Sequence, residues 1–290
     1  MHRRLFLAAA SLAPFAAAAA DRIQAVASFS ILADMLRQLA GERATVTSVV
    51  PTNGDAHEYQ PRPTDARAVM AARLLVVNGL GLDPWMQRLA GAAGFKGVLT
   101  VAASGVTPRK LPGSAAIDPH AWQDPRNGAL YATAIGDGLA AADPAGAADY
   151  RAAATQYAAE ILRLDAWIES QFSTIPASTR RIVTTHDAFG YFGARYGIEF
   201  LAAQGMSTEA EPSARSIATL VAQIKREKVR AVFIENMTDP RLAHMLARET
   251  GAVLGGTVYS DALSPADGPA ATYLDMLRHN TKLFVTTMRR

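Results

Sequence analysis

The stretch that decides the fold reads PAGAADYRAAATQYAAEILRLDAWIESQF and covers residues 144–172. After Gly146 the chain contains neither glycine nor proline until Pro176, so nothing interrupts a helix there. The large apolar side chains recur at intervals that place them on one side of a helix, namely Tyr150, Tyr157, Ile161, Leu164 and Ile168. The pattern predicts one helix of roughly 25–28 residues, about 40 Å long at a rise of about 1.5 Å per residue.

Short strands alternate with longer helices on both sides of this helix. Runs rich in β-branched residues predict strands at 24–28, 45–50, 74–78 and 98–101 before it, and at 181–185, 198–202, 229–235 and 253–257 after it. Helical patterns fall between the strands at 30–40, 64–72, 84–93, 188–196, 213–227, 240–250 and 270–288. Thr64 is the expected N-cap of the second of these helices. Such alternation is typical of parallel α/β sheets.

The long helix has two interpretations. It can be a core helix of one domain, or a rigid connection between two α/β lobes. Four predicted strands before it and four after it favour the second interpretation. We therefore predict an α/β fold of two lobes, each with a four-stranded parallel sheet, joined by one long backbone helix. The N-terminal lobe is expected at residues 21–143, the linking helix at 144–175 and the C-terminal lobe at 176–290.

The first twenty residues have the layout of a secretory signal peptide. Arg3 and Arg4 precede an apolar stretch over residues 5–15, and an alanine run ends at Ala20. We expect cleavage just before Asp21. The two arginines with Leu-Phe-Leu also resemble a twin-arginine export signal. No later stretch approaches the ~18 uninterrupted apolar residues of a membrane-spanning helix, so we expect an exported protein.

Cysteine is absent from all 290 residues. This excludes disulfides, cysteine-ligated metal sites, thiol nucleophiles and a lipidated N-terminal cysteine. The chain has 29 Lys and Arg against 26 Asp and Glu, a formal charge of +3, and the signal peptide holds two of the arginines. The nearly neutral remainder gives no electrostatic basis for nucleic acid as a partner. We predict a mature protein that is freely soluble in the periplasm and not lipid-anchored.

Three histidines occupy loops that follow predicted strands or lie beside prolines: His57, His120 and His186. Because ligands bind beyond the carboxyl ends of parallel strands, these loops can converge in a cleft between two lobes. Asp261, after the last predicted strand, stands in an equivalent place and would complete a four-ligand site for a divalent ion. Each histidine taken alone is better explained by a structural role than by metal binding, and it is their shared placement that favours a metal site. His244 and His279 lie inside predicted helices and are assigned no function.

Several motifs of the chain resemble those of the solute-binding proteins of zinc and manganese ABC transporters. The motifs are GDAHEYQP at 54–61, VVNGLGLDPW at 76–85, DPHAWQDP at 118–125, THDAFGYF at 185–192 and AEPSARSI at 210–217. The resemblance implies two α/β lobes joined by one long helix, with one metal ion per chain held between them. It maps the ligands onto His57, His120, His186 and Asp261. It also implies a monomeric periplasmic protein that delivers metal to an ABC permease in the inner membrane and is not an enzyme.

The ligand set favours zinc. Three imidazoles and one carboxylate suit Zn2+, whereas Mn2+ prefers more oxygen ligands. The resemblance implies that manganese members using a carboxylate as third ligand would have one at the position of His186. Manganese remains the alternative, because some three-histidine members are linked to it. Residues 107–117 contain no histidine or acid where many zinc members have a His-rich loop. Metal is then loaded by a periplasmic metallochaperone or captured directly.

Two other classes of function use the same residues or scaffold. A zinc metallohydrolase would need a ligand position left open for water, and four protein ligands would close it. A metal-independent adhesin would make no use of the loop histidines. Asp118, Asp124 and Glu235 are candidates to orient ligand histidines through hydrogen bonds, although each can have a purely structural role. Asp187 is a candidate cap of the helix that follows it.

Overall fold

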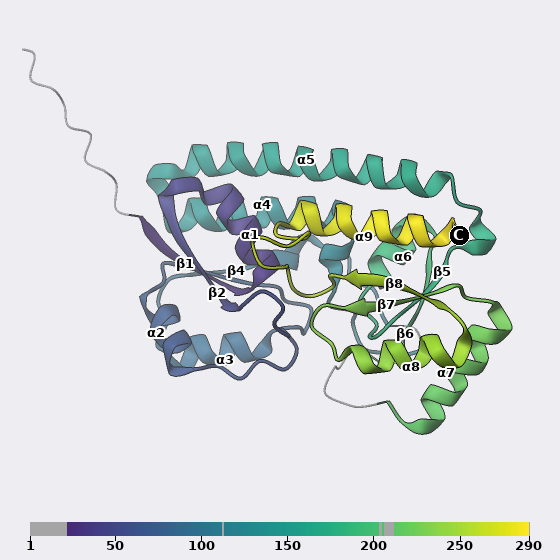
Figure 1. Ribbon diagram of the computed structural model, residues 1–290. Helices are drawn as coiled ribbons and strands as arrows, with labels where there is room; N and C mark the ends of the chain where they lie inside the picture. The colour runs from purple at the N-terminus through teal and green to yellow at the C-terminus, as the bar shows by residue number, and fades with distance from the viewer. Residues whose placement is uncertain (1–21, 112, 203–204, 206–211, 290) are drawn as a thin grey trace, which may run out of the picture.

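The computed structural model describes residues 22–111, 113–202, 205 and 212–289. The signal peptide predicted for residues 1–20, and the cleavage site before Asp21, lie outside these residues. Figure 1 shows two α/β lobes side by side, with one long helix lying along both. Within the described part of the chain, no helix is both long enough and apolar enough to cross a membrane.

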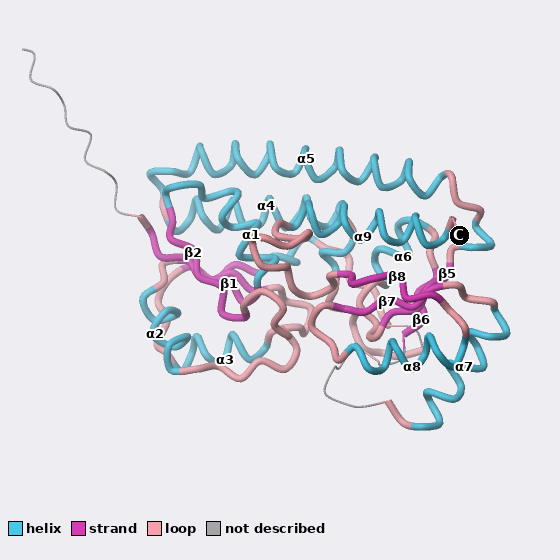
Figure 2. Tube along the Cα trace, viewed as in Figure 1, coloured by secondary structure: helices cyan, strands magenta, loops and turns pink. Residues whose placement is uncertain are grey.

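The first sheet is parallel, with the strand order β2-β1-β3-β4. Its strands are β1 Ile23–Phe29, β2 Ala44–Val50, β3 Leu74–Val77 and β4 Val98–Val101. Helices cover both faces, as expected for a parallel sheet (Figure 2). They are α1 Ser30–Ala40, α2 Pro63–Ala71, α3 Pro84–Ala92 and α4 Pro125–Ala142. All four residues of the central strand β3 are buried, which explains its continuous apolar sequence.

The second sheet repeats this arrangement, with the order β6-β5-β7-β8 and parallel pairing. Its strands are β5 Arg181–Thr184, β6 Glu199–Ala202, β7 Ala231–Glu235 and β8 Val253–Val258. Its helices are α6 Gly190–Tyr196, α7 Ala214–Glu227, α8 Pro240–Thr250 and α9 Tyr273–Met288. The eight predicted strands are therefore confirmed, as are the two four-stranded parallel sheets.

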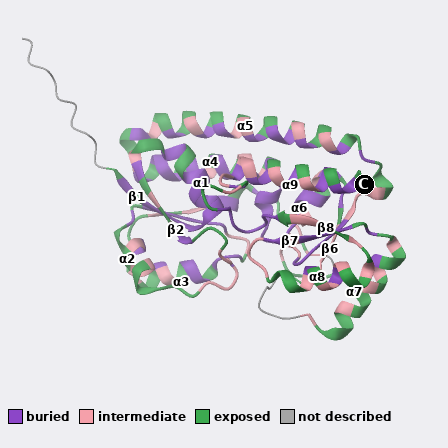
Figure 3. Cartoon of the chain, in the orientation of Figure 1, coloured by how far each residue is buried: buried purple, intermediate pink, exposed green. Residues whose placement is uncertain are grey.

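The long helix α5 covers Ala147–Ser173, 27 residues, after a short 3₁₀ turn at Pro144–Gly146. Its predicted apolar stripe is buried and its other side faces solvent (Figure 3). The helix packs against α4 in the first lobe and α9 in the second. It therefore contacts both lobes along its length, as the prediction of a linking helix requires.

Sequence reasoning missed α4. The Asp124 side chain accepts a hydrogen bond from the backbone N–H of Arg126, and Pro125 occupies the first helical position, so the N-terminal signal is present. Glycines within the helix obscured the periodic pattern. Gly136 lies against α5, where an added Cβ would come within 2.6 Å of the Ala154 Cβ. The small residue allows the two helices to pack closely.

The start of α2 also differs from the prediction. The helix begins at Pro63, and Arg62, not Thr64, is its N-cap. A residue before proline is pushed towards extended backbone, and Arg62 has φ −98° and ψ 160°. The Asp65 carboxylate then accepts the backbone N–H of Arg62 at 2.7 Å. The proline thus sets the helix start one residue earlier than the threonine signal.

After β8 the chain returns to the first lobe before entering α9. The backbone N–H of Leu263 donates to Ser30 Oγ at 3.0 Å, and that of Tyr273 donates to Asp34 Oδ2 at 2.8 Å. Both acceptors lie on α1. Helix α9 then runs back beneath α5 into the second lobe (Figure 1). Two segments therefore connect the lobes, and the second lies immediately after Asp261.

Candidate metal centre

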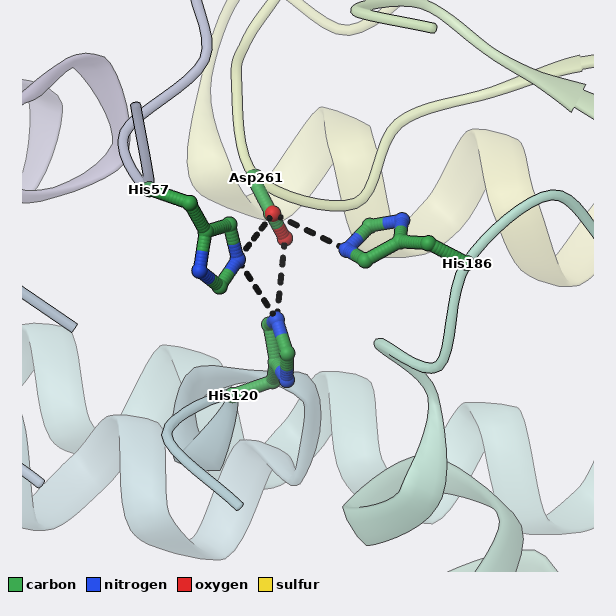
Figure 4. A group of neighbouring side chains, drawn as sticks. All are labelled: His57, His120, His186 and Asp261. Atoms are coloured by element: carbon green, nitrogen blue, oxygen red, sulfur yellow. Dashed lines mark hydrogen bonds and ion pairs between the residues drawn. The ribbon is translucent and has the colours of Figure 1, made fainter. Parts of the chain in front are cut away.

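Four loops from different parts of the chain bring His57, His120, His186 and Asp261 together between the lobes. His57 lies between β2 and α2, and His120 immediately precedes a short 3₁₀ turn at Ala121–Gln123. His186 follows β5 and Asp261 follows β8. One ligand atom from each side chain lies within 4.8 Å of all the others. Figure 4 shows the imidazole rings and the carboxylate turned towards one common point.

The spacing of the ligand atoms matches that around a small cation. His57 Nε2 lies 3.1 Å from His120 Nε2 and 3.0 Å from Asp261 Oδ2. His186 Nε2 is 3.1 Å from the same carboxylate oxygen. A tetrahedral ion with bonds of about 2.0–2.1 Å separates its ligand atoms by roughly 3.3 Å. These three separations are close to the tetrahedral value and all four atoms lie within 4.8 Å of one another, so a modest adjustment would let the four side chains hold one tetrahedral ion.

The centre is almost completely shielded from solvent. His120, His186 and Asp261 are fully buried, and the His57 side chain is 7% exposed. Asp261 Oδ1 makes no hydrogen bond with the described part of the chain. Its distance to His120 Nε2 is 3.7 Å, too long for a hydrogen bond. Because a buried anionic oxygen without a partner is costly, this atom fits a ligand of a bound cation.

Two carboxylates orient two of the histidines. Asp118 Oδ1 lies 2.8 Å from His120 Nδ1, and Glu235 Oε2 lies 2.6 Å from His186 Nδ1. A carboxylate at Nδ1 holds the proton there and leaves Nε2 free to bind a metal. The orienting role suggested for Asp118 thus matches its hydrogen bond to His120, whereas Asp124 instead caps α4. Glu235 Oε2 and His186 Nδ1 are close but do not form a hydrogen bond, so Glu235 holds His186 by charge and through the backbone. Glu235 Oε1 also accepts the backbone N–H of His186 at 2.8 Å.

The pKa values in the centre reflect this pairing. Burial disfavours the charged form of His120, but Asp261 and Asp118 outweigh burial and raise the pKa of this imidazole to about 9. The pKa of His186 is also raised, because Glu235 and Asp261 outweigh its burial. Burial would raise the pKa of Asp261, yet the two histidines hold it well below its ordinary value. Without a cation, protons on the histidines balance the buried carboxylates.

The other residues named from the sequence have different positions. His244 is exposed on α8, and His279 on α9 contacts the Thr257 carbonyl oxygen, with 3.0 Å between Nε2 and that oxygen. Asp187 does not cap α6, whose N-cap is Phe189. Trp122 packs its ring edge against His120 with 5.3 Å between ring centroids.

Arg109 forms an ion pair with Asp118 beside the metal centre, and sequence reasoning did not identify it. Its Nη1 lies 3.7 Å from Asp118 Oδ2, on the side of the carboxylate away from His120. An added Cβ at Gly190 would lie 2.2 Å from that nitrogen, so glycine is required for the approach. Arg109 belongs to an irregular loop, where no periodic pattern marks a functional side chain.

A model of the family described as zinc-uptake complex component A, periplasmic, matches residues 25–287. The manganese-binding lipoprotein MntA of Halalkalibacterium halodurans is 37% identical over 266 residues, covering 92% of this chain and 88% of MntA. The iron-binding protein YfeA of Yersinia pestis is 32% identical over 262 residues, covering 89% and 84%. The solved structure of the periplasmic zinc-binding protein TroA of Treponema pallidum aligns with a TM-score of 0.88 and 27% identity, covering 93% of this chain and 100% of TroA. These three relatives are named for three different metals.

Proposed function

This chain belongs to the family of periplasmic zinc-uptake components, and we propose that it captures Zn2+ through His57, His120, His186 and Asp261. It is a substrate-binding protein of a metal ABC transporter, and its family is not one of enzymes. The observation that carries the proposal is the convergence of four ligand atoms, all within 4.8 Å of one another, from four separate loops. One ion per chain would lie between the lobes.

The donor set supports zinc over the other metals named among the relatives. Three imidazole nitrogens and one carboxylate oxygen, spaced as around a tetrahedron, suit Zn2+. Mn2+ prefers six ligands with more oxygen among them. Manganese is the alternative cargo, since Asp261 Oδ1 lies close enough to the centre to serve as a fifth ligand.

Delivery requires a membrane partner. Substrate-binding components act with the permease and ATPase of their transporter. We propose that this protein works in the periplasm as a monomer, loaded by a metallochaperone or by direct capture. MntA is named a lipoprotein, whereas this sequence contains no cysteine to carry a lipid. We therefore propose a protein without a lipid anchor, and the intact mass of the protein isolated from the periplasm tests this.

Metal titration tests the proposed cargo. The mature chain is stripped with a chelator, titrated with Zn2+ and Mn2+ against a competing chromophoric chelator, and assayed for bound metal. We expect one tightly bound Zn2+ per chain, weaker Mn2+, and a loss of about a hundredfold or more in Zn2+ affinity for His57→Ala and for His186→Ala. The exposed His244 provides the matched control, because His244→Ala should bind as the wild type does. If the wild type binds no stoichiometric metal, the proposal is wrong. If it binds Mn2+ more tightly than Zn2+, manganese is the transported metal.

A further inference from the structure

The motif VVNGLGLDPW at residues 76–85 contributes no ligand to the metal centre, yet its polar side chains are buried. It begins in the central strand β3 and ends in the first turn of α3. Asn78, Asp83 and Trp85 are 0%, 2% and 6% exposed. Buried polar groups need partners, and the partners of these three reveal what the motif does.

Asp83 holds the loop of the motif in an unusual conformation. Three consecutive residues have positive φ: Gly79 at 85°, Leu80 at 53° and Gly81 at 86°. A leucine in this region is strained, so the surrounding structure must impose the conformation. The Asp83 carboxylate does so by accepting the backbone N–H groups of Asn78 at 2.7 Å and Gly79 at 3.1 Å. The two ends of the loop are thereby fixed relative to each other.

Asn78 connects this loop to the segment that carries His120. Its Nδ2 donates to the carbonyl oxygen of Pro119 at 3.0 Å. The hydroxyl of Tyr131, on α4, donates to Asn78 Oδ1 at 2.7 Å. This second bond orients the amide so that its N–H group faces Pro119. Because Asn78 is fully buried, water cannot replace either contact.

Trp85 connects the other end of the motif to the segment that carries His57. Its indole Nε1 donates to the carbonyl oxygen of Ala56 at 3.0 Å. Its ring also packs against Tyr59, with the ring centroids 5.3 Å apart. Ala56 is fully buried, so the indole supplies a partner to a carbonyl that water does not reach.

The two acceptors share one property: each carbonyl belongs to the peptide bond immediately before a candidate ligand histidine. A peptide unit is planar, so fixing its carbonyl also fixes the direction in which the next residue leaves it. We propose that Asn78 and Trp85 are positioning residues that set the separation of His120 and His57, whose Nε2 atoms lie 3.1 Å apart. The motif is then a brace between the two ligand loops of the N-terminal lobe. This inference rests on the proposed metal-binding function.

Trp85→Phe gives the sharpest test, because it keeps an aromatic ring and removes the N–H donor. Trp167→Phe is the matched control, since Trp167 lies half-buried on α5, away from the centre. We expect Trp85→Phe to weaken Zn2+ binding about five- to tenfold, the usual effect of one lost hydrogen bond. We also expect an altered visible spectrum of bound Co2+, which reports ligand geometry and which a purely structural defect would leave unchanged. The melting temperature of metal-free Trp85→Phe should fall further than that of Trp167→Phe, because Trp85→Phe leaves the buried Ala56 carbonyl oxygen without its donor.

Asn78→Ala is the second variant and should weaken Zn2+ binding in the same direction, with the Co2+ spectrum again altered. The proposal is overturned if Trp85→Phe keeps wild-type Zn2+ affinity and an unchanged Co2+ spectrum, or if Trp167→Phe alters both equally. A wild-type chain that binds no stoichiometric metal would instead overturn the proposed function itself. The wild-type titration therefore distinguishes the two failures.

Discussion

The loops carrying Asp261 and His186 both follow strands of the second sheet, but they are fastened to different lobes. The Asp261 loop is held mainly by the first lobe, although the carbonyl oxygen of Ala262 also accepts Asn236 Nδ2, from the second lobe, at 3.2 Å. The carbonyl oxygen of Ser260 accepts Trp122 Nε1 at 2.9 Å and Gln123 Nε2 at 2.8 Å. Two residues after Asp261, the backbone N–H of Leu263 donates to Ser30 Oγ at 3.0 Å. Hydrogen bonds to the N-terminal lobe thus hold Asp261 on both sides.

The His186 loop is held mainly by its own lobe. Glu235, at the end of β7, accepts the backbone N–H of His186 and lies at its Nδ1. The same carboxylate accepts the Thr185 hydroxyl at 2.7 Å. The links to the first lobe come five residues later, at Tyr191. Its hydroxyl donates to the Asp118 carbonyl oxygen at 3.3 Å and accepts the backbone N–H of Arg109 at 3.0 Å. His186 is therefore more loosely tied to the first lobe than Asp261 is.

The different attachments of the two loops show that the position of a ligand along the chain does not decide which lobe holds it. Asp261 lies in the C-terminal half but is fastened beside His57 and His120. A separation of the lobes that broke the hydrogen bond between Asn236 and Ala262 would leave these three together and withdraw His186. Such rigid-body opening is a common way for two-lobed binding proteins to release a ligand.

The largest expected effect comes from removing Asp261. Asp261→Ala deletes the anionic member of the candidate ligand set and removes the counter-charge that the buried histidines share. We expect Zn2+ affinity to fall about a thousandfold, against about a hundredfold for His186→Ala, which leaves three ligands fastened to one lobe. Competition titration measures both variants. Asp267→Ala, an exposed acid in the same segment, should bind Zn2+ normally. An equal or larger loss in His186→Ala would contradict the comparison.

Sequence patterns predicted the strands and the linking helix, because both appear as local periodicity. The four converging residues were predicted from their loops, which follow strands or lie beside prolines, together with the family resemblance that maps the ligands onto them. The attachment of the Asp261 loop to the first lobe leaves no such signal. Ser30 and Leu263 are 233 residues apart, and nothing near either residue identifies the other. Helix α4 escaped prediction for a different reason, since its glycines allow close packing against α5, α9 and β4 and weaken the helical pattern.

The pH dependence of the stability of the metal-free protein should distinguish the contribution of His120, in the first lobe, from that of His186, in the second. The pKa of His120 is raised from 6.5 to about 9, and that of His186 is also raised. The charged imidazoles therefore stabilise the fold fully below about pH 6.5, and the contribution of His120 is lost as the pH rises through about 9. We expect the free energy of unfolding to fall by roughly 2–3 kcal/mol over this range.

Thermal unfolding at pH 6, 7.5 and 9 measures this loss. The Zn2+-loaded protein should show little of it, because the metal replaces the protons. In Glu235→Gln the contribution of His186 should shrink while that of His120, paired with Asp118, persists. A flat profile for the metal-free wild type would contradict the raised pKa values. Zn2+ affinity should rise with pH over the same range, since binding must displace the protons.

The smallest expected effect tests the fastening of the Asp261 loop directly. Ser30→Ala removes the hydroxyl that accepts the Leu263 N–H, while the buried position still accommodates alanine. We expect a loss of about 1 kcal/mol in the stability of the metal-free protein and a rise of roughly two- to fivefold in the rate of Zn2+ release, because Asp261 is held less firmly. Stopped-flow mixing with a chelator measures the release rate. Ser48→Ala is the matched control, since the Ser48 hydroxyl bonds only locally, to the Val50 carbonyl oxygen within β2. If both variants release Zn2+ at the same rate, the hydrogen bond to α1 does not restrain Asp261. The different attachments of the two loops would then have no effect on metal release.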